Sequence, residues 1–329
     1  MTTKNVKLGT TGPEVFPLAF GCMGMSGGIY GKTDDDESVK TLQAAMERGV
    51  TLFDTGDFYG MGHNELLVGR AIRGRRERVQ LSVKFGGLRG PDGSWSGFDA
   101  RPAAVKNFCA YSLVRLGVEA IDVYRPARLD PNVPIEDTIG AIVDLVKAGY
   151  VKHIGLSEVG ADTIRRAAKV HPIVDLQIEH ALVSRAPEAK IFPTLHELGI
   201  SATLYGVYSR GLLTGSKPAA KGDFRGYLPR FAGEAGQKNA SVVANVQRFA
   251  KDHGRTPAQL LLAWSRARQP NFVPTIGMKS TAQLDDALAA VAAPLTSAEC
   301  DALEALVPAD AVAGDRYAAE QMKHLDSEK

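Results

Sequence analysis

The sequence predicts a single (β/α)8 TIM barrel that spans residues 1–329, and three observations lead to this fold class. Eight short apolar segments with β-type composition alternate with amphipathic helical patterns along the chain. Hydrophobic residues make up 44% of the 329 residues, which is enough for a substantial core. The glycines after the first strand, Gly21, Gly24 and Gly27, lack the GxGxxG spacing of a doubly wound dinucleotide-binding sheet, which is the alternative fold.

The first predicted element precedes the barrel. Residues 6–15 contain two short extended segments around Gly9 and Gly12-Pro13, a pattern typical of a small hairpin. We expect this N-terminal hairpin to close the bottom of the barrel.

The eight predicted strands follow in order, and most are separated by a helix. The strands are Leu18–Gly21, Thr51–Asp54, Val79–Lys84, Ala120–Tyr124, His153–Ser157, Ile173–Gln177, Ser201–Tyr205 and Phe272–Ile276. The helices are Asp36–Arg48, Asn64–Ile72, Pro102–Leu116, Ile135–Lys147, Ala161–Ala168, Glu188–Leu198 and Pro257–Arg268. Glycine follows four of these helices, as at Leu116-Gly117, which is a common stop signal.

One long segment interrupts the alternation. Residues Gly206–Asn239 are rich in Gly, Pro, Arg and Lys and show little periodicity, so we predict a long irregular loop. A loop of this length within one domain usually serves function.

Charge, cysteine content and hydropathy narrow the functional classes. The formal net charge of only +2 does not indicate a strongly basic surface, so we do not expect nucleic acid as a partner. The three cysteines, Cys22, Cys109 and Cys300, are far apart, which disfavours both a disulfide framework and a zinc cluster. The same cysteine pattern fits a reducing, cytoplasmic compartment and gives no reason to expect a metal. No signal peptide or membrane-length apolar run is evident, so we expect no membrane partner.

Chemistry-bearing residues gather where the strands end, and a TIM barrel carries its active site at that face. Asp54 ends the second strand, Tyr59 follows it, and Lys84 ends the third. Each residue alone is more often a turn, packing or solvated residue, but their coincidence at neighbouring strand ends favours a site. Asp54 can hold the Lys84 ammonium, and Lys84 is expected to lower the pKa of Tyr59, which makes Tyr59 a candidate general acid.

Longer motifs around these residues resemble the aldo-keto reductase family. The segment Phe53–Gly60 is similar to the family signature, and residues 62–69 continue it. Further similar segments follow in order at residues 154–157, 177–180, 205–215 and 274–284. The resemblance therefore runs along nearly the whole chain.

The resemblance implies NADPH-dependent reduction of a carbonyl group, with Asp54, Tyr59 and Lys84 as three of the family's four catalytic residues. It also implies that NADPH is held by Ser157 and Gln177 at the nicotinamide carboxamide, Tyr205 on its ring, Gly211, Leu212 and Gly215 around the pyrophosphate, and Gly277, Lys279, Ser280 and Gln283 at the adenosine end. A lysine beside a hydroxyl suits a phosphomonoester, which favours NADPH over NADH. The long loop is then expected to cover the cofactor.

The sequence departs from the family at the fourth catalytic position. The family usually has a His there, and this chain has Ala127, as in a bacterial and fungal subgroup that includes pyridoxal reductases. His63 or Arg125 is a candidate replacement donor. The expected substrate pocket contains Phe58, Trp95, Arg125, Ala127 and Phe231, and the open space beside Ala127 suits either a pyridoxal-like aldehyde or a bulky cyclic ketone.

Other functions remain open from the sequence. The missing His is also compatible with an NADPH-binding regulatory or sensor protein with little turnover, because the family resembles potassium-channel β subunits. A metal hydrolase on the same barrel would need clustered His and carboxylate ligands, which the seven histidines do not suggest. The sequence does not fix the direction of the reaction, and it leaves monomer and homo-oligomer open.

Overall fold

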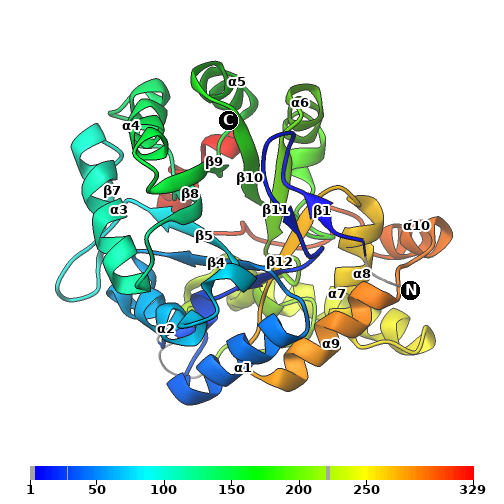
Figure 1. Ribbon diagram of the computed structural model, residues 1–329. Helices are drawn as coiled ribbons and strands as arrows, with labels where there is room; N and C mark the ends of the chain where they lie inside the picture. The colour runs from blue at the N-terminus through cyan, green and yellow to red at the C-terminus, as the bar shows by residue number, and fades with distance from the viewer. Residues whose placement is uncertain (1–3, 28, 220–222) are drawn as a thin grey trace.

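Eight parallel strands close into a barrel in the computed structural model, which describes residues 4–27, 29–219 and 223–329 (Figure 1). In order around the barrel the strands are β3 (Ala19–Gly21), β4 (Leu52–Gly56), β5 (Gln80–Phe85), β8 (Ile121–Pro126), β9 (Val151–Ser157), β10 (Ile173–Glu179), β11 (Ser201–Tyr205) and β12 (Val273–Gly277). Each matches one predicted strand. The predicted TIM barrel is confirmed.

Helices surround the barrel, and all seven predicted helices are present. They are α1 (Asp35–Glu47), α2 (His63–Ile72), α3 (Pro102–Leu116), α4 (Ile135–Lys147), α5 (Ala161–Val170), α6 (Ile191–Leu198) and α8 (Pro257–Arg268). The ends follow local chemistry: Thr256 and Gln259 form a capping box at the start of α8, and Gly117 ends α3 with a positive φ of 66°. The structure adds α7 (Gly233–Asp252), α9 (Thr281–Ala292), α10 (Ser297–Leu306) and α11 (Ala319–Met322).

The start of α7 corrects the predicted loop. The irregular connection after β11 ends at Ala232, and residues 233–239 are helical; its residues 220–222 lie outside the described part. Glycine and polar residues hide the helical pattern at this end of α7. The helix is nevertheless anchored by a buried stripe formed by Asn239, Val242, Val246 and Ala250.

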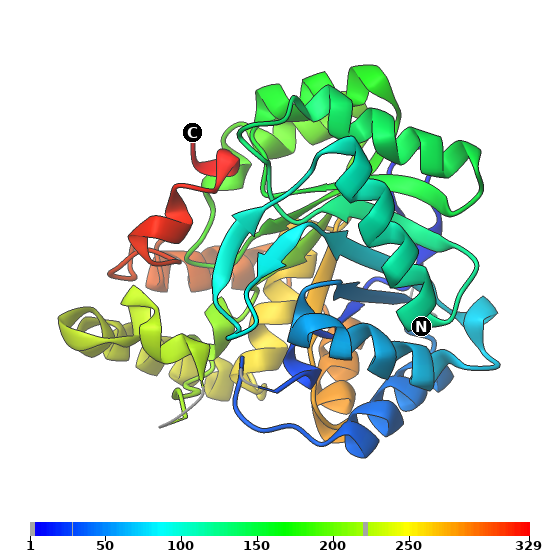
Figure 2. The ribbon, with the colours of Figure 1, turned by 90° about the vertical axis from the view of Figure 1, so that its left-hand side faces the viewer.

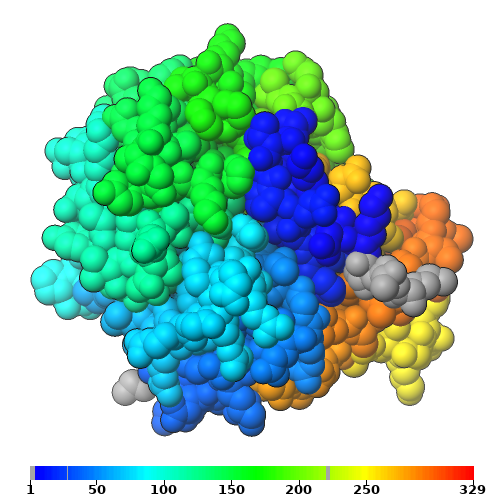
Figure 3. Space-filling view, viewed as in Figure 1, coloured from blue at the N-terminus to red at the C-terminus, as the bar shows by residue number. Residues whose placement is uncertain are grey.

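The N-terminal hairpin closes one end of the barrel, as predicted. Strands β1 (Val6–Lys7) and β2 (Glu14–Val15) pair antiparallel. The buried side chains of Leu8 and Val15 join those of Ala19, Leu52, Val123 and Val273, which come from the early parts of the barrel strands. Figure 3 shows the hairpin, in dark blue, across the centre of this face.

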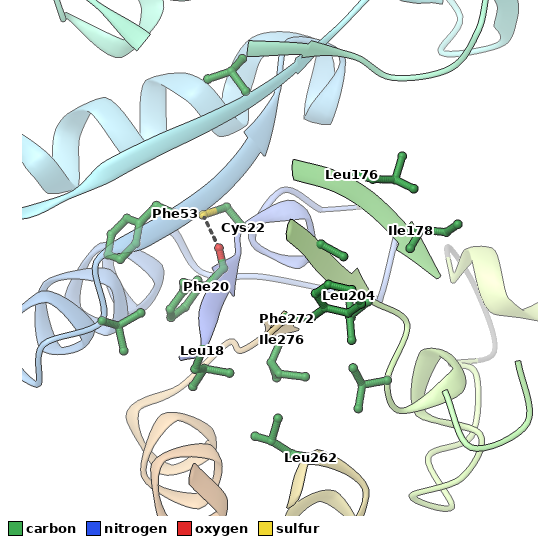
Figure 4. Close-up of a cluster of buried hydrophobic side chains, with 14 of the residues drawn as sticks. Leu18, Phe20, Cys22, Phe53, Leu176, Ile178, Leu204, Leu262, Phe272 and Ile276 are labelled. Carbon is green, nitrogen blue, oxygen red and sulfur yellow. Dashed lines mark hydrogen bonds between the residues drawn. The ribbon is translucent and has the colours of Figure 1, made fainter. Parts of the chain in front are cut away.

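The main hydrophobic core lies between the strands and the helices. Phe20 of β3 and Phe53 of β4 contact each other with ring centroids 5.7 Å apart. In Figure 4, Leu176, Ile178 and Leu204 extend from β10 and β11, while Leu262 approaches from α8. This continuous apolar layer fixes the strands, so that polar side chains at their carboxyl ends have a rigid support.

Three connecting segments gather at the end of the barrel opposite the N-terminal hairpin (Figure 2). They are the hairpin of β6 (Gly87–Arg89) and β7 (Trp95–Phe98), the irregular segment after β11, and the chain after α10. They surround the carboxyl ends of the strands. Across the described residues, none of the helices combines the length and apolar character needed to cross a membrane.

Candidate functional site

The centre of the site is a buried ion pair between Asp54 and Lys84. Neighbouring strands β4 and β5 carry the two residues, and strand pairing brings their carboxyl ends together. The Lys84 ammonium donates to Asp54 Oδ1, and the two side chains are only 5% and 6% exposed. Ser82 Oγ and Gln177 Nε2 each donate to Asp54 Oδ2 at 2.8 Å. Both oxygens of the Asp54 carboxylate therefore accept hydrogen bonds, and the carboxylate fixes the position of Lys84.

Tyr59 lies beside this pair, as the sequence predicts. It follows β4 in a short 3-10 turn, Tyr59–Gly62, and the centre of its ring is 5.2 Å from Lys84 Nζ. Burial and the Asp54 carboxylate raise the pKa of Tyr59 well above its ordinary value. The expected net lowering of this pKa is wrong for the protein alone, because burial and the nearby Asp54 carboxylate outweigh the cations around the ring. Tyr59 keeps its proton at neutral pH and can act as a donor.

Lys84 is also shifted by its surroundings. Burial lowers its pKa, and the Asp54 carboxylate opposes that change. The result is an amine whose charge depends on the presence of Asp54. The trio of Asp54, Lys84 and Tyr59 thus combines a proton donor, a cation and a group that holds the cation.

The residues expected at the nicotinamide lie on β9, β10 and β11. Ser157 pairs with Gln177 in the strand register, and Tyr205 ends β11. The Ser157 hydroxyl is buried and has no hydrogen-bond partner among the described residues. An unpartnered buried hydroxyl costs free energy unless a bound group satisfies it. Ser157 therefore fits a polar ligand group such as the nicotinamide carboxamide.

The loop after β11 contains several residues with a left-handed backbone conformation. Gly211 and Gly215 have φ values of 90° and 80°, and Ser209 and Arg210 also have positive φ. A Cβ at Gly211 would lie 3.0 Å from the Ser216 side chain. The buried Ser209 hydroxyl has no partner within the described ranges. Leu212 is buried beneath this turn.

The residues expected at the adenosine end surround the start of α9. Gly277 ends β12 and is exposed, and Lys279 and Ser280 follow it. Ser280 caps the helix by accepting from the amide of Gln283 at 3.4 Å. The Gln283 side chain in turn accepts from the amide of Lys279 at 2.7 Å. A helix N-terminus with a nearby ammonium favours a bound anion.

The expected substrate residues divide into two groups. Phe58 lies between Tyr59 and Trp95, with ring centroids 4.9 Å and 5.5 Å away, and Trp95 is 49% exposed. Ala127 is buried at the end of β8, and its amide donates to Phe85 O on β5. Phe231 belongs to the segment between β11 and α7, with its ring 6.0 Å from the Arg225 guanidinium of the same segment.

Arg125 and His63 do not take the role of the missing imidazole. Arg125 is fully buried, donates to Asp175 at 3.0 Å and to Ser82 at 2.9 Å, and so packs within the barrel rather than lining an opening. Its inclusion in the substrate pocket is therefore wrong. His63 contacts Ser26 Oγ and Asp35 Oδ2, each at 3.0 Å, at the start of α2.

Sequence reasoning missed a charged cluster beside the nicotinamide residues. Glu158 directly follows the last residue of β9 and Glu179 is the last residue of β10, and Arg316 from the chain after α10 pairs with both. Arg210 joins Glu179 at 2.8 Å, and Tyr317 lies against the Arg210 guanidinium at 4.3 Å. The position of Glu158 next to Ser157 was a usable signal. Nothing local in the sequence links Arg316 to the strand ends.

In the described part of the chain, no three His, Cys, Asp or Glu side chains form a group that could hold a metal ion.

Comparison with known proteins identifies the family of the chain. The Aldo/keto reductase family matches residues 17–308 of the chain. A curated relative, "Probable aldo-keto reductase 1" from Glycine max, is 41% identical over 318 residues, which cover 95% of this chain and 91% of the relative.

Solved structures show the same similarity. The glycerol dehydrogenase AKR11B4 from Gluconobacter oxydans has a TM-score of 0.83 at 25% identity, covering 93% of this chain and 96% of that one. The holo form of aldo-keto reductase AKR11C1 from Bacillus halodurans has a TM-score of 0.77 at 29% identity, covering 93% and 97%.

Proposed function

The chain belongs to the aldo/keto reductase family of oxidoreductases, and on that basis we propose that it is an NADPH-dependent carbonyl reductase with Tyr59 as the general acid. The observation that carries the proposal is the contact of Tyr59 with the Asp54–Lys84 pair at the carboxyl ends of β4 and β5. NADPH supplies the hydride when it is bound.

The residues of the chain handle the proton and the charge. As negative charge develops on the carbonyl oxygen, Tyr59 donates its proton to that oxygen. The Lys84 ammonium stabilises the phenolate that Tyr59 becomes, and Asp54 holds Lys84 beside the ring. A raised pKa in the resting site keeps Tyr59 protonated until the transition state develops.

The proposed NADPH site combines the residues described above. Ser157, Gln177 and Tyr205 hold the nicotinamide, and the turn that contains Gly211, Leu212 and Gly215 surrounds the pyrophosphate. The buried Ser157 hydroxyl, which has no partner among residues 4–27, 29–219 and 223–329, supports the placement of the nicotinamide. The Lys279 ammonium and the capped start of α9 support selection of the 2′-phosphate of NADPH.

The proposed substrate is an aldehyde or ketone that fills the space beside Ala127, bounded by Phe58 and Trp95. A pyridoxal-like aldehyde and a bulky cyclic ketone both suit this space. We expect Ala127→His to change the preference between them more than it changes the Kd for NADPH, because Ala127 directly follows β8 whereas the proposed cofactor residues lie on β9 to β12 and in the segments after β11 and β12. A loss of NADPH binding with unchanged substrate preference would contradict this placement.

The first experiment is NADPH oxidation by the purified protein with pyridoxal, benzaldehydes, a dicarbonyl and bulky cyclic ketones. Because the solved relatives include a glycerol dehydrogenase, glycerol and other alcohols with NADP+ test the reverse direction. Tyr59→Phe is the control, and we expect kcat to fall by about 10²–10⁴-fold while NADPH still binds. Tight NADPH binding without turnover would favour a regulatory protein instead. Absence of NADPH binding would refute the proposal.

A further inference from the structure

The residue after Ala127 carries a positive charge without a carboxylate partner. Arg128 Nη1 donates to Ala127 O at 2.6 Å, and Arg128 Nη2 donates to Tyr317 Oη at 3.4 Å. Within the described residues, no carboxylate oxygen lies within 4.0 Å of this guanidinium. Two of the five N–H groups of the guanidinium therefore have protein acceptors, and the others remain for a ligand.

The C-terminal part of the chain holds this arginine in place. Tyr205 Oη donates to Glu158 Oε1 at 2.7 Å, so the Tyr317 hydroxyl, 3.0 Å from Tyr205 Oη, donates to it. The Tyr317 oxygen then accepts from Arg128. A directed chain of hydrogen bonds thus runs from Arg128 through Tyr317 and Tyr205 to the carboxylate of Glu158.

A buried ion pair fixes Tyr317 at this point. Arg316 Nη2 donates to Glu158 Oε2 at 2.6 Å, and Arg316 Nη1 donates to Glu158 Oε1 at 3.0 Å. The Arg316 side chain is only 8% exposed, and Ser327 Oγ adds a bond of 2.6 Å to the same carboxylate. Although burial opposes ionisation, the Arg316 guanidinium holds the pKa of Glu158 at about 2. The pair is therefore ionised at all pH values of use.

Arg128 also lies near the proton donor. The Ala127 amide donates to Phe85 O at 2.9 Å, which ties the end of β8 to the residue after Lys84. The positive charge of Arg128 lowers the pKa of Tyr59 against the larger effects of burial and Asp54. The guanidinium, which follows Ala127 in the chain, is thus close enough to Tyr59 to act on its charge.

We propose that Arg128, oriented by Tyr317, donates to the substrate's carbonyl oxygen and stabilises its negative charge, in the place where the chain lacks an imidazole. The inference rests on the proposed reductase function. Hydride moves from NADPH to the carbonyl carbon, the C=O π electrons move to oxygen, and that oxygen takes the proton of Tyr59. NADP+ and an alcohol result, and Tyr59 regains its proton from water.

The planar guanidinium also predicts a class of substrate. A guanidinium presents its N–H groups as a rigid planar fork, which suits two oxygen acceptors on neighbouring carbon atoms. The site is expected to prefer a carbonyl with an adjacent carbonyl or carboxylate oxygen over the same compound without it. Tyr317 is a positioning residue in this scheme, because it acts through Arg128.

The test compares four full-length proteins: the wild type, Arg128→Met, Arg128→Lys and Tyr317→Phe. Each is assayed for NADPH oxidation with 1-phenyl-1,2-propanedione and with propiophenone, which lacks the second oxygen, and the Kd for NADPH is measured separately. Comparing the ratio of the two substrates between variants cancels their different intrinsic reactivities. We expect Arg128→Met to lower kcat/KM for the diketone by about 10²–10³-fold while the Kd for NADPH stays within about threefold.

The conservative variants separate chemistry from folding. Arg128→Lys keeps the charge and is expected to recover part of the rate, but not the preference for the diketone. Tyr317→Phe is expected to lower kcat by about tenfold with little change in KM, since it loosens Arg128 without removing it. Arg128→Met is also expected to move the alkaline limb of the kcat/KM profile to higher pH, because Arg128 no longer lowers the pKa of Tyr59.

The outcomes are distinguishable. If Arg128→Met and Arg128→Lys both keep the wild-type kcat/KM and diketone preference while Tyr59→Phe loses activity, the role of Arg128 is refuted and the reductase function stands. If the wild type binds NADPH but oxidises it with no carbonyl compound, the proposed function fails and this inference fails with it. A loss of NADPH binding in Arg128→Lys would equally refute the inference, because it would assign Arg128 to the cofactor.

Discussion

Replacing Asp54 by Asn removes one charge of a buried pair and keeps the shape of the side chain. The Asp54 carboxylate accepts from Lys84, Ser82 and Gln177. The single oxygen of an Asn side chain cannot serve all three donors, and its NH2 group would face a donor. The Lys84 ammonium is left in a buried position with the Arg125 guanidinium as a neighbouring like charge.

The size of the effect follows from the burial of the pair. Removing one partner of a buried ion pair costs about 3–5 kcal/mol, and the retained hydrogen bonds place Asp54→Asn near the lower value. For a chain of 329 residues, a loss of about 3 kcal/mol lowers Tm by about 4 °C. We also expect kcat/KM at neutral pH to fall by about 10²-fold or more, because Lys84 loses its charge and its position.

The pH dependence gives the sharper test. A lysine with a folded-state pKa below its unfolded value binds fewer protons when folded, so stability rises with pH between those two values. In Asp54→Asn the folded pKa of Lys84 falls further, which widens this window toward neutral pH. The difference in unfolding free energy between wild type and variant is therefore expected to shrink as the pH rises from 6 to 9.

Asp175→Asn is the matched control. It removes the carboxylate of a second buried pair, in which the side chains of Arg125 and Asp175 are both fully buried. Because arginine does not deprotonate in proteins, the stability loss in this variant should not change with pH. Urea unfolding at several pH values measures both variants. A pH-independent loss in Asp54→Asn, parallel to that of Asp175→Asn, would contradict the assignment of a titrating Lys84.

Three further predictions test other parts of the site. Burial raises the pKa of Asp57 to about 7, and one of its carboxylate oxygens has no partner in the described part of the chain. The folded protein bears the cost of ionising Asp57, which is absent below the unfolded-state pKa and grows as the pH rises to 7. Asp57→Asn should therefore raise the unfolding free energy by about 2–4 kcal/mol at pH 8 and by little at pH 4. Lys279→Met should weaken NADPH binding by about 30-fold and leave NADH binding nearly unchanged in fluorescence titrations; equal losses for both cofactors would remove Lys279 from the 2′-phosphate. Trp95→Ala should raise KM for bulky carbonyls by about tenfold. Because Trp95 is half exposed, the unfolding free energy of this variant should stay within about 1 kcal/mol of the wild-type value. A larger loss of stability would make Trp95 a packing residue.

Local sequence signals were sufficient to predict the barrel and the contact between Asp54 and Lys84. Each strand is a short apolar run between polar turns, and its end can be located within one or two residues. Asp54 and Lys84 end adjacent strands, so the parallel arrangement alone predicts that they meet. The start of α7 was missed because the residues before Asn239 are mostly small or polar, and tertiary packing of Val242 and Val246 decides the helix.

The electrostatic state of Tyr59 was not predictable in the same way. Its neighbours were identified correctly, but its pKa depends on the balance of a cation, an anion and burial. Burial is set by the whole assembly, including Phe58 and the β6–β7 hairpin, which no strand-end rule describes. Identifying the residues of a site from sequence is therefore easier than predicting the charge each carries.

Arg125 and Arg128 show why strand geometry decides the role of a charged side chain. Arg125 lies within β8, level with Lys84 in the strand register, and its side chain turns into the barrel toward Asp175. Arg128 lies two residues beyond the end of the strand, where the backbone is free of the ladder and the side chain reaches Tyr317. Both arginines are close to Ala127 in the sequence. Their different roles follow from the end of β8, because Arg125 precedes that end and packs in the barrel, whereas Arg128 follows it and is the one proposed to contact a substrate. The partner that orients Arg128 is 189 residues away, and a contact of that separation has no local signal. Residues at strand ends can therefore be predicted from the sequence as parts of the site, whereas the residues supplied by the C-terminal segment can be identified only from the three-dimensional structure.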